Sequence, residues 1–183
     1  MMPSRMMASK MMASKMMTSK MMTSKQLTLE AALKRRQSIK TLVFTNGAFD
    51  LLHAGHVGYL QQARSLGDAL FLGLNSDQGV AALKGPKRPI VPQADRIRVL
   101  SALSCVDAVI LFDDLTAHRL IEALKPEIYA KGGDYVLDPA QPGALLPEAP
   151  LVQSYGGRVE LIPYQAGHST TDLIRRIVET YGD

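Results

Sequence analysis

Compact apolar runs of five to seven residues alternate along the chain with longer stretches in which apolar residues recur every three or four positions. The runs are rich in Val, Ile, Leu and Phe, as is typical of strands buried on both faces, and the stretches are typical of amphipathic helices. The runs predict strands at residues 41–45, 69–75, 106–112, 127–132 and 158–163. The stretches predict helices at residues 27–40, with Thr28 as the N-cap, and at 54–67, 93–103, 116–125 and 170–181.

Strands that alternate with helices predict βαβ units and an α/β fold, in which a parallel sheet of about five strands is covered by helices on both faces. The segment 134–150 holds four prolines, interrupts the alternation and is predicted to be mainly a surface excursion. Ligands of such sheets bind at the carboxyl ends of the strands. Chemistry is therefore expected after Thr45, Asn75, Ala130 and Pro163.

The composition is that of an ordinary globular protein, with 46% hydrophobic and 21% charged residues. The 183 residues suit a single domain, which we assign to residues 26–183. No apolar run approaches the roughly 18 residues that cross a bilayer, so a membrane span is not expected. The single cysteine, Cys105, permits no internal disulfide and favours a reducing, cytoplasmic location.

Residues 1–25 form a separate, repetitive tail of five pentapeptides: MMPSR, MMASK, MMASK, MMTSK and MMTSK. The tail holds five of the 21 basic residues and no acidic one, which leaves 16 basic against 17 acidic residues in the body. The body is therefore not expected to bind nucleic acid through its charge. A period of five places no apolar stripe on a helix, so we predict a disordered tail without function. Its basic, acid-free composition also resembles that of a transit peptide.

Two histidines follow the first predicted strand, in the stretch TNGAFDLLHAGH. His53 and His56 lie one turn apart at the start of a helix, and Gly55 lets an anion approach the backbone N–H groups. The stretch lacks both G-x-G-x-x-G and G-x-x-x-x-G-K-[ST]. Two imidazoles at a helix N-terminus suit a triphosphate. The alternative, half of a zinc site, would have to recruit His118 or His168.

The pattern T-N-G-x-F-D-x-L-H-x-G-H resembles the signature of the cytidylyltransferase-like nucleotidyltransferases, Rossmann-like α/β/α enzymes. These enzymes join a nucleoside triphosphate to a phosphorylated small molecule and release pyrophosphate. Within them, the chain is similar to the adenylyltransferases of ADP-heptose synthesis over about residues 40–178. The segments that carry this narrower resemblance are NSD at 75–77, LKG at 83–85, RP at 88–89, RIRVLSAL at 96–103, KGGDY at 131–135 and GHSTTDLIRRI at 167–177.

The resemblance implies transfer of AMP from ATP to D-glycero-β-D-manno-heptose 1-phosphate, for lipopolysaccharide core synthesis. It implies Mg²⁺ that arrives with ATP, a homodimer, and neither nucleic acid nor membrane as a partner. Many relatives carry a preceding sugar-kinase domain, so the kinase step is expected from another chain. Two alternatives stay open: a CTP-dependent enzyme that acts on glycerol 3-phosphate or a similar phospho-alcohol, and a non-catalytic nucleotide-binding module.

The resemblance also assigns roles residue by residue, and it implies no metal site made by the protein alone. The catalytic groups that hold the triphosphate and neutralise its charge would be His53, His56 and Lys84. The nucleotide-binding residues would be Thr45, Asn46, Gly47, Gly55, Arg96, Lys131, Gly132, Ser169, Thr170 and Thr171. The sugar-phosphate-binding residues would be Asp50, Asn75, Asp77 and Asp134, with Asp50 also the expected acidic contact to Mg²⁺.

Several of these residues have an ordinary structural alternative. Lys84, in the predicted loop 83–89, could be a solvated surface lysine, and Ser169 or Thr170 could simply cap a helix. The chain also departs from its relatives at two places. Ala82 stands where many relatives carry a basic residue, and the Pro-rich stretch 138–150 replaces a charged helix.

Overall fold

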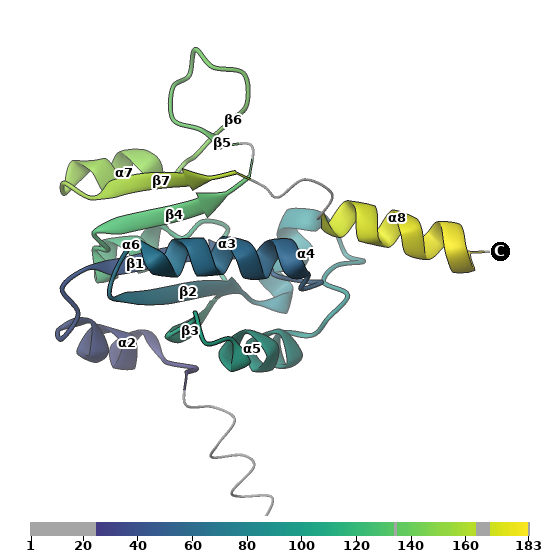
Figure 1. Cartoon of the computed structure of the whole chain (residues 1–183), viewed down its shortest axis with the longest axis horizontal. Helices are drawn as coiled ribbons and strands as arrows, with labels where there is room; N and C mark the ends of the chain where they lie inside the picture. Colours follow the sequence, from purple (N-terminus) through teal and green to yellow (C-terminus); the bar gives the residue numbers. More distant parts are fainter. Residues whose placement is uncertain (1–24, 134, 164–168, 183) are drawn as a thin grey trace, which may run out of the picture.

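The computed structural model describes residues 25–133, 135–163 and 169–182, and the tail prediction for residues 1–24 lies outside them. Its middle layer is a parallel sheet of five strands in the order β3-β2-β1-β4-β7 (Figure 1). The strands are β1 Leu42–Gly47, β2 Ala69–Asn75, β3 Ala108–Phe112, β4 Ile128–Gly132 and β7 Arg158–Ile162. The predicted strand number and parallel arrangement are confirmed.

Helices cover both faces of the sheet, as the α/β/α prediction requires. They are α2 Leu29–Arg36, α3 Ala54–Ser65, α4 Asp77–Lys84, α5 Gln93–Ala102, α6 His118–Leu124, α7 Ala149–Ser154 and α8 Thr170–Tyr181. Side chains from α2, α6 and α7 share one buried cluster with Phe44 and Phe71 of the sheet. Side chains from α3 and α5 share the other cluster with Val43 and Leu70. Because adjacent strand residues point to opposite faces, each strand contributes to both clusters.

Several predicted ends differ from the structure. Thr28 caps α2 as expected, since its hydroxyl accepts the N–H of Ala31 at 3.2 Å, but the helix ends at Arg36 and not at residue 40. Helix α4 was not predicted, because the stretch 77–84 is short and contains a glycine that lowers helix propensity. Lys84, expected in a mobile loop, is the last residue of that helix.

The Pro-rich segment leaves the body and then returns to it. Two short strands, β5 Tyr135–Val136 and β6 Ala144–Leu145, pair at its base, and the segment projects beyond the sheet (Figure 1). Residues 137–145 are exposed, which agrees with the predicted excursion. The final part, however, is buried and leads into α7, which packs on the sheet and was not predicted.

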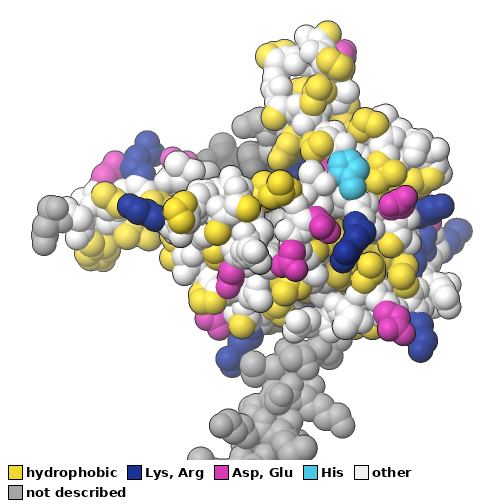
Figure 2. Space-filling view, turned by 180° about the vertical axis from the view of Figure 1, so that it is seen from behind, with side chains coloured by type: hydrophobic (Ala, Val, Ile, Leu, Met, Phe, Trp, Pro, Cys, Tyr) yellow, Lys and Arg dark blue, Asp and Glu magenta, His cyan; other side chains and the backbone are white. Residues whose placement is uncertain are grey.

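The order of the strands places a crevice at the carboxyl end of β1. The chain runs outward from β1 to β2 and β3, and then resumes at β4 on the other side of β1. The connections therefore leave β1 and β4 in opposite directions, and this switch point is where open α/β sheets bind ligands. Basic and acidic side chains are interspersed on the face that Figure 2 shows. No helix in the described part of the chain has the length and apolar character to cross a bilayer.

Candidate functional site

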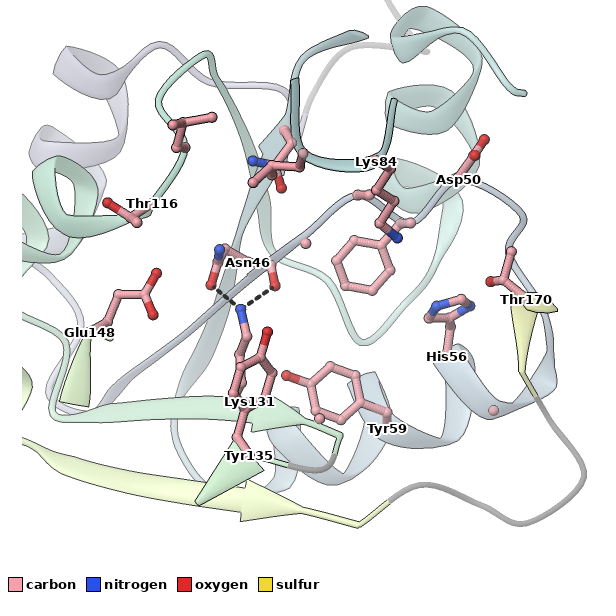
Figure 3. A pocket seen from close by; sticks show the side chains of 18 of the residues that line it. Asn46, Asp50, His56, Tyr59, Lys84, Thr116, Lys131, Tyr135, Glu148 and Thr170 are labelled. Atoms are coloured by element: carbon pink, nitrogen blue, oxygen red, sulfur yellow. Dashed lines mark hydrogen bonds between the residues drawn. The ribbon is translucent and has the colours of Figure 1, made fainter. Parts of the chain in front are cut away.

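A cavity of about 460 Å³ opens at the carboxyl ends of β1, β2 and β4 (Figure 3). Most of the predicted site residues line it: Asn46, Gly47, Asp50, His53, Gly55, His56, Asn75, Lys84, Lys131, Gly132 and Thr170. The lining residues that the sequence analysis did not single out include Tyr59, Thr116, Tyr135 and Glu148. Phe49 is buried in the core, and its ring lies against that of His56.

The histidine pair lies where α3 begins. His53 is the N-cap residue, yet its side chain makes no capping hydrogen bond, and the first turn contains no acidic residue. The two imidazole rings lie 3.9 Å apart, between centroids, and are tilted by 32°. The Nδ1 atom of His56 is buried and has no hydrogen-bond partner among the described residues. The start of α3 thus keeps its positive dipole end free of any protein carboxylate, which suits an anion.

The electrostatics of this end keep His56 uncharged. Burial, with smaller contributions from the charges of His53 and Lys84, lowers the pKa of His56 to about 4. A neutral imidazole at pH 7 can still donate one hydrogen bond to a phosphate oxygen. Burial also lowers the pKa of Lys84, with a smaller contribution from Arg88. The Lys84 and His56 side chains point into the same part of the cavity (Figure 3).

Asn46 and Lys131 form the floor of the cavity, where β1 lies beside β4. The Asn46 Oδ1 atom accepts hydrogen bonds from the Tyr129 hydroxyl at 2.6 Å and from Lys131 Nζ at 2.9 Å. Lys131 Nζ also donates to the backbone oxygen of Asn46 at 3.3 Å. Burial lowers the pKa of Lys131. These bonds fix the lysine between the two strand ends, so its cationic head faces the cavity from a defined position.

Thr45 does not contact the cavity, in contrast to its expected role at the nucleotide. It is fully buried, and its hydroxyl lies 2.5 Å from that of Tyr59, which in turn donates to the Ala130 oxygen at 3.0 Å. A carbonyl only accepts, so Thr45 must donate to Tyr59. A Cβ on Gly132 would lie 3.2 Å from the Tyr59 ring, so glycine permits this close approach. Tyr59 lies one turn after His56, a spacing that could have identified it.

Arg96 and Asp77, predicted to bind the nucleotide and the sugar phosphate, contact each other and hold the loops together. The Arg96 side chain is 1% exposed and donates to the backbone oxygens of Ala48 at 2.5 Å and Asn75 at 2.9 Å. It also pairs with Asp77 at 2.8 Å. Neither residue lines the cavity. A guanidinium has five fixed donors, so one buried arginine can join the ends of β1 and β2 to the start of α4.

Asp50 lines the cavity, but its carboxylate is engaged by the protein. It accepts the N–H groups of Ile90 and Val91, each at 2.8 Å, and the Arg88 guanidinium at 2.6 Å. Burial alone would raise the pKa of Asp50, but these hydrogen bonds and the charge of Arg88 lower it overall. These bonds hold the loop at residues 88–91, and the expected contact of Asp50 with Mg²⁺ or sugar stays a prediction.

The start of α8 separates the three predicted hydroxyl residues. Ser169 caps the helix, because its hydroxyl accepts the N–H of Asp172 at 3.0 Å and donates to the carboxylate of the same residue at 2.8 Å. Its structural alternative is thus confirmed. Thr170 lines the cavity, whereas Thr171 is exposed and does not. The predicted contact of Asp134 lies outside the described residues.

The described residues contain no group of three or more His, Cys, Asp or Glu side chains that could hold a metal ion. His118, the possible zinc partner, instead contacts the Thr116 hydroxyl at 2.8 Å and the Pro147 oxygen at 3.2 Å. His168 lies outside the described residues. The carboxylate of Asp50 is engaged as described above, so a Mg²⁺ ion would have to be held mainly by phosphate oxygens.

Comparisons with known proteins agree with this geometry. The cytidylyltransferase-like family model matches residues 44–176. The chain is 54% identical over 144 residues to the bifunctional protein HldE of Geobacter sulfurreducens, and the match covers 79% of this chain and 28% of that protein. It is 56% identical over 142 residues to HldE of Pelobacter propionicus, covering 78% of this chain and 28% of the relative. The chain thus spans little more than a quarter of the length of these relatives.

Two solved structures share the fold. The lipopolysaccharide core biosynthesis protein of Thermoplasma volcanium superposes with a TM-score of 0.52 at 29% identity, covering 68% of this chain and 96% of that one. The pantoate-beta-alanine ligase of Francisella tularensis, solved with a bound ATP analogue and beta-alanine, gives a TM-score of 0.51 at 14% identity. This second match covers 85% of this chain and 78% of the ligase, and it supports the fold alone.

Proposed function

The chain belongs to the cytidylyltransferase-like family, and from this premise we propose that it is an adenylyltransferase that acts on a sugar phosphate. The proposed reaction joins AMP from ATP to D-glycero-β-D-manno-heptose 1-phosphate and releases pyrophosphate. Its product, ADP-heptose, would serve lipopolysaccharide core synthesis. The similarity to proteins named HldE and to a lipopolysaccharide core biosynthesis protein supports this choice of acceptor.

One observation carries the proposal: the start of α3 combines two imidazoles with an uncapped helix N-terminus inside the cavity. A triphosphate needs several donors and positive charges at one place, and few side chains supply both as compactly. The neutral His56 imidazole and the Lys84 ammonium face that place together. The pair therefore favours a nucleoside triphosphate over a sugar or a metal ion as its ligand.

The chemistry follows from positioning and charge. An oxygen of the sugar phosphate would attack the α-phosphorus of ATP in line, and the bond from that phosphorus to the pyrophosphate oxygen would break. His53 and His56 would donate hydrogen bonds to oxygens that gain negative charge, and Lys84 would neutralise part of that charge. Bound Mg²⁺ would shield the phosphates. No covalent nucleophile from the protein is required.

Asn75 is placed to hold the second substrate. Its side chain ends β2, lines the cavity and is 4% exposed. Its Nδ2 atom is buried and has no hydrogen-bond partner among the described residues. An unpaired buried amide is costly, so a ligand oxygen that accepts from it would gain that free energy back on binding. We assign Asn75 to the phosphate of the sugar phosphate.

The preference for ATP rests on the base. The imidazoles, Lys84 and Thr170 would contact phosphates and cannot distinguish bases. Backbone groups near Ala130–Gly133 would then contact the base edge. Such groups can pair with the amino group and N1 of adenine, whereas guanine presents the opposite donor pattern. CTP is the closer competitor because its amino group and ring nitrogen resemble the edge of adenine.

A pyrophosphate-release assay tests the proposal directly. ATP, CTP and GTP are each combined with heptose 1-phosphate or glycerol 3-phosphate, with and without Mg²⁺. The expected result is fastest release from ATP with heptose 1-phosphate, and release only when Mg²⁺ is present. Equal or faster release from CTP with glycerol 3-phosphate would favour the phospho-alcohol alternative. Nucleotide binding without release from any pair would favour a non-catalytic module.

A homodimer and a cytoplasmic location belong to the same proposal. Helix α8 has no buried residue, and Ile177, Val178 and Tyr181 are 48%, 59% and 82% exposed. Apolar side chains are visible along this projecting helix in Figure 2. Exposed apolar residues on one helix favour contact with a second copy. Light scattering at micromolar concentration should give twice the chain mass, and the single chain mass at all concentrations would contradict the dimer.

A further inference from the structure

The cavity has a second end that the proposed phosphate chemistry does not use. Glu148 and Thr116 lie on one side of it, whereas His56, Lys84 and Thr170 lie on the other (Figure 3). Asn46 and Lys131 lie between the two groups. The two ends also differ in charge, because the phosphate end carries the Lys84 ammonium and the far end carries the Glu148 carboxylate.

Glu148 is held firmly at this end although it comes from the Pro-rich excursion. Its side chain is 3% exposed, and its Oε1 atom accepts the N–H of Ala117 at 3.2 Å. The neighbouring Pro147 oxygen contacts His118 Nε2 at 3.2 Å. These two contacts fasten the end of the excursion to the loop that follows β3. The carboxylate is therefore a fixed part of the cavity wall.

Thr116 presents an acceptor to the cavity. A carbonyl oxygen only accepts, so His118 Nε2 must carry the proton in its bond to Pro147. In the neutral imidazole, Nδ1 then accepts, and the Thr116 hydroxyl donates to it at 2.8 Å. The lone pairs of the Thr116 oxygen remain for a ligand. Glu148 and Thr116 together offer acceptors, and their ligand must offer donors.

The charges of Glu148 and of the substrates indicate which chemical groups can be these donors. Both proposed substrates carry phosphate, and a buried carboxylate repels phosphate strongly where water is excluded. Glu148 also acts on Lys131 between the two ends: burial lowers the pKa of Lys131, and the negative charge of Glu148 raises it in part. A neutral group with several O–H donors fits this end, and a vicinal diol can donate both of its hydrogens to one carboxylate.

We propose that Glu148, together with Thr116, binds hydroxyl groups of the sugar and thereby determines the acceptor specificity of the site. This inference rests on the proposed function and deepens it. By repelling the phosphate, Glu148 also turns the sugar so that its phosphate faces His56 and Lys84. The returning end of the Pro-rich segment thus supplies the wall that selects the acceptor.

The test is Glu148→Gln, which keeps an oxygen for the Ala117 N–H and removes the charge. We expect the KM for heptose 1-phosphate to rise about tenfold or more, because a hydroxyl loses a charged acceptor. The KM for ATP and the melting temperature should change little. The control is Glu122→Gln on the exposed face of α6, which removes the same charge outside the cavity and should change neither KM.

Unchanged KM values in Glu148→Gln, or equal changes for both substrates together with a lower melting temperature, would reduce Glu148 to a cap of α6 and overturn the proposal. A second measurement begins with the wild-type protein and then repeats the assay on the same variant. Wild-type protein is assayed with sugar 1-phosphates that each lack one hydroxyl. At least one deletion should raise the KM about tenfold in the wild type and have little effect in Glu148→Gln. Equal KM values for every analogue would also overturn it.

Failure of the proposed function gives a different pattern. If wild-type protein releases pyrophosphate only with glycerol 3-phosphate and CTP, the assignment of heptose 1-phosphate is wrong. The hydroxyl subsite is then tested with the accepted phospho-alcohol. A raised KM for that substrate in Glu148→Gln, at constant KM for CTP, supports the subsite. A wild-type KM in the variant overturns it.

Discussion

Two helices begin at the cavity, and their first turns are built in opposite ways. Helix α8 is capped by Ser169, and the carboxylate of Asp172 lies in its first turn, bonded to the cap. Helix α3 begins at His53 with neither a side-chain cap bond nor an acidic residue. A helix start that already holds a carboxylate has its dipole partly neutralised. The difference favours the start of α3 as the proposed anion site, with the Thr170 side chain as the main contribution of α8.

The two helices also differ in how they are held. Helix α3 buries Leu60 and Ala63 in the core, and Tyr59 connects it to both β1 and β4. Helix α8 has no buried residue and projects from the body (Figure 1). Few buried contacts mean a low free energy of local opening. The chemistry is therefore expected to depend on the rigid helix start.

The largest effect should come from the histidines at the start of α3. His53→Ala and His56→Ala should each lower turnover by about 100-fold or more, the loss typical of one preorganised group that stabilises charge. Both side chains line the cavity, so the melting temperature should change little. Steady-state kinetics with ATP and heptose 1-phosphate measure the effect. Near-normal turnover in both variants would move the anion site away from α3.

A smaller effect should follow from giving α3 the carboxylate that α8 already has. Ala54 is exposed at the first position of α3. Ala54→Asp should raise the KM for ATP about tenfold, because the added charge repels the triphosphate at a dipole end. Ala54→Asn is the neutral control of the same shape and should have a near-normal KM. Equal effects of both variants would indicate a steric cause.

The reciprocal variant, Asp172→Asn, removes the carboxylate from α8. The comparison predicts a change of less than about threefold in the KM for ATP, since α8 is not the principal anion site. A large decrease in this KM would mean that Asp172 masks a second anion site. The comparison between the two helix starts would then need to be reversed.

Acid should weaken the fold through His56. The pKa of His56 is about 4 in the folded protein against about 6.5 in an unfolded chain, so the unfolded state binds more protons between these values. Stability is therefore lost as pH falls from about 6.5 to about 4. Discounting for partial exposure, we expect roughly 1 kcal/mol, or about 2–4 °C in melting temperature. His56→Asn should lose correspondingly less between pH 7 and pH 4.5, and equal losses would contradict the assignment.

The smallest effect is expected from the tail. Lys25, which we had assigned to the tail, contacts the body: its backbone oxygen accepts the N–H of Val109 at 2.7 Å, and its Nζ donates to Leu103 at 2.6 Å. A protein truncated to begin at Lys25 should keep its turnover and melting temperature. These contacts lie at β3, an edge strand of the sheet, away from the cavity at the ends of β1 and β4. Removal of residues 1–24 should therefore not affect the starts of α3 and α8. A drop of several degrees would show that the repeats pack on the body.

The strands and the phosphate end could be predicted because their signals are local. Buried strands need continuous apolar runs, and His53 and His56 are brought together by one turn of a helix. The contacts of Asp50, Asp77 and Arg96 within the protein were not predicted, for the opposite reason. Their residue types suit a ligand, but most of their partners are backbone groups and side chains 16 to 48 positions away in the chain. Only the folded loops show that these charges are already engaged.

Glu148 is the opposite case: a residue that lines the cavity but that the sequence did not identify. In the sequence it is one acidic residue in a Pro-rich segment, with no motif around it. It is buried because α7 packs on the sheet and because the segment returns to the loop after β3. Tyr59 was within reach of local reasoning, since its spacing from His56 follows the helix. Glu148, which is positioned by tertiary contacts alone, could not be identified in this way.

The excursion between β4 and β7 has a consequence for how such proteins diverge. Strands β4 and β7 pair without a break in register, from Ile128–Arg158 to Gly132–Ile162. Residues 137–145 take no part in this pairing. Insertions or replacements in that connection can therefore accumulate without disturbing the sheet or the start of α3. If Glu148, at the returning end of this connection, determines the acceptor, then changes in the connection can alter substrate choice. The residues that act on the phosphates need not change with it. Lineages can then explore new acceptors while the nucleotide half stays under constant selection.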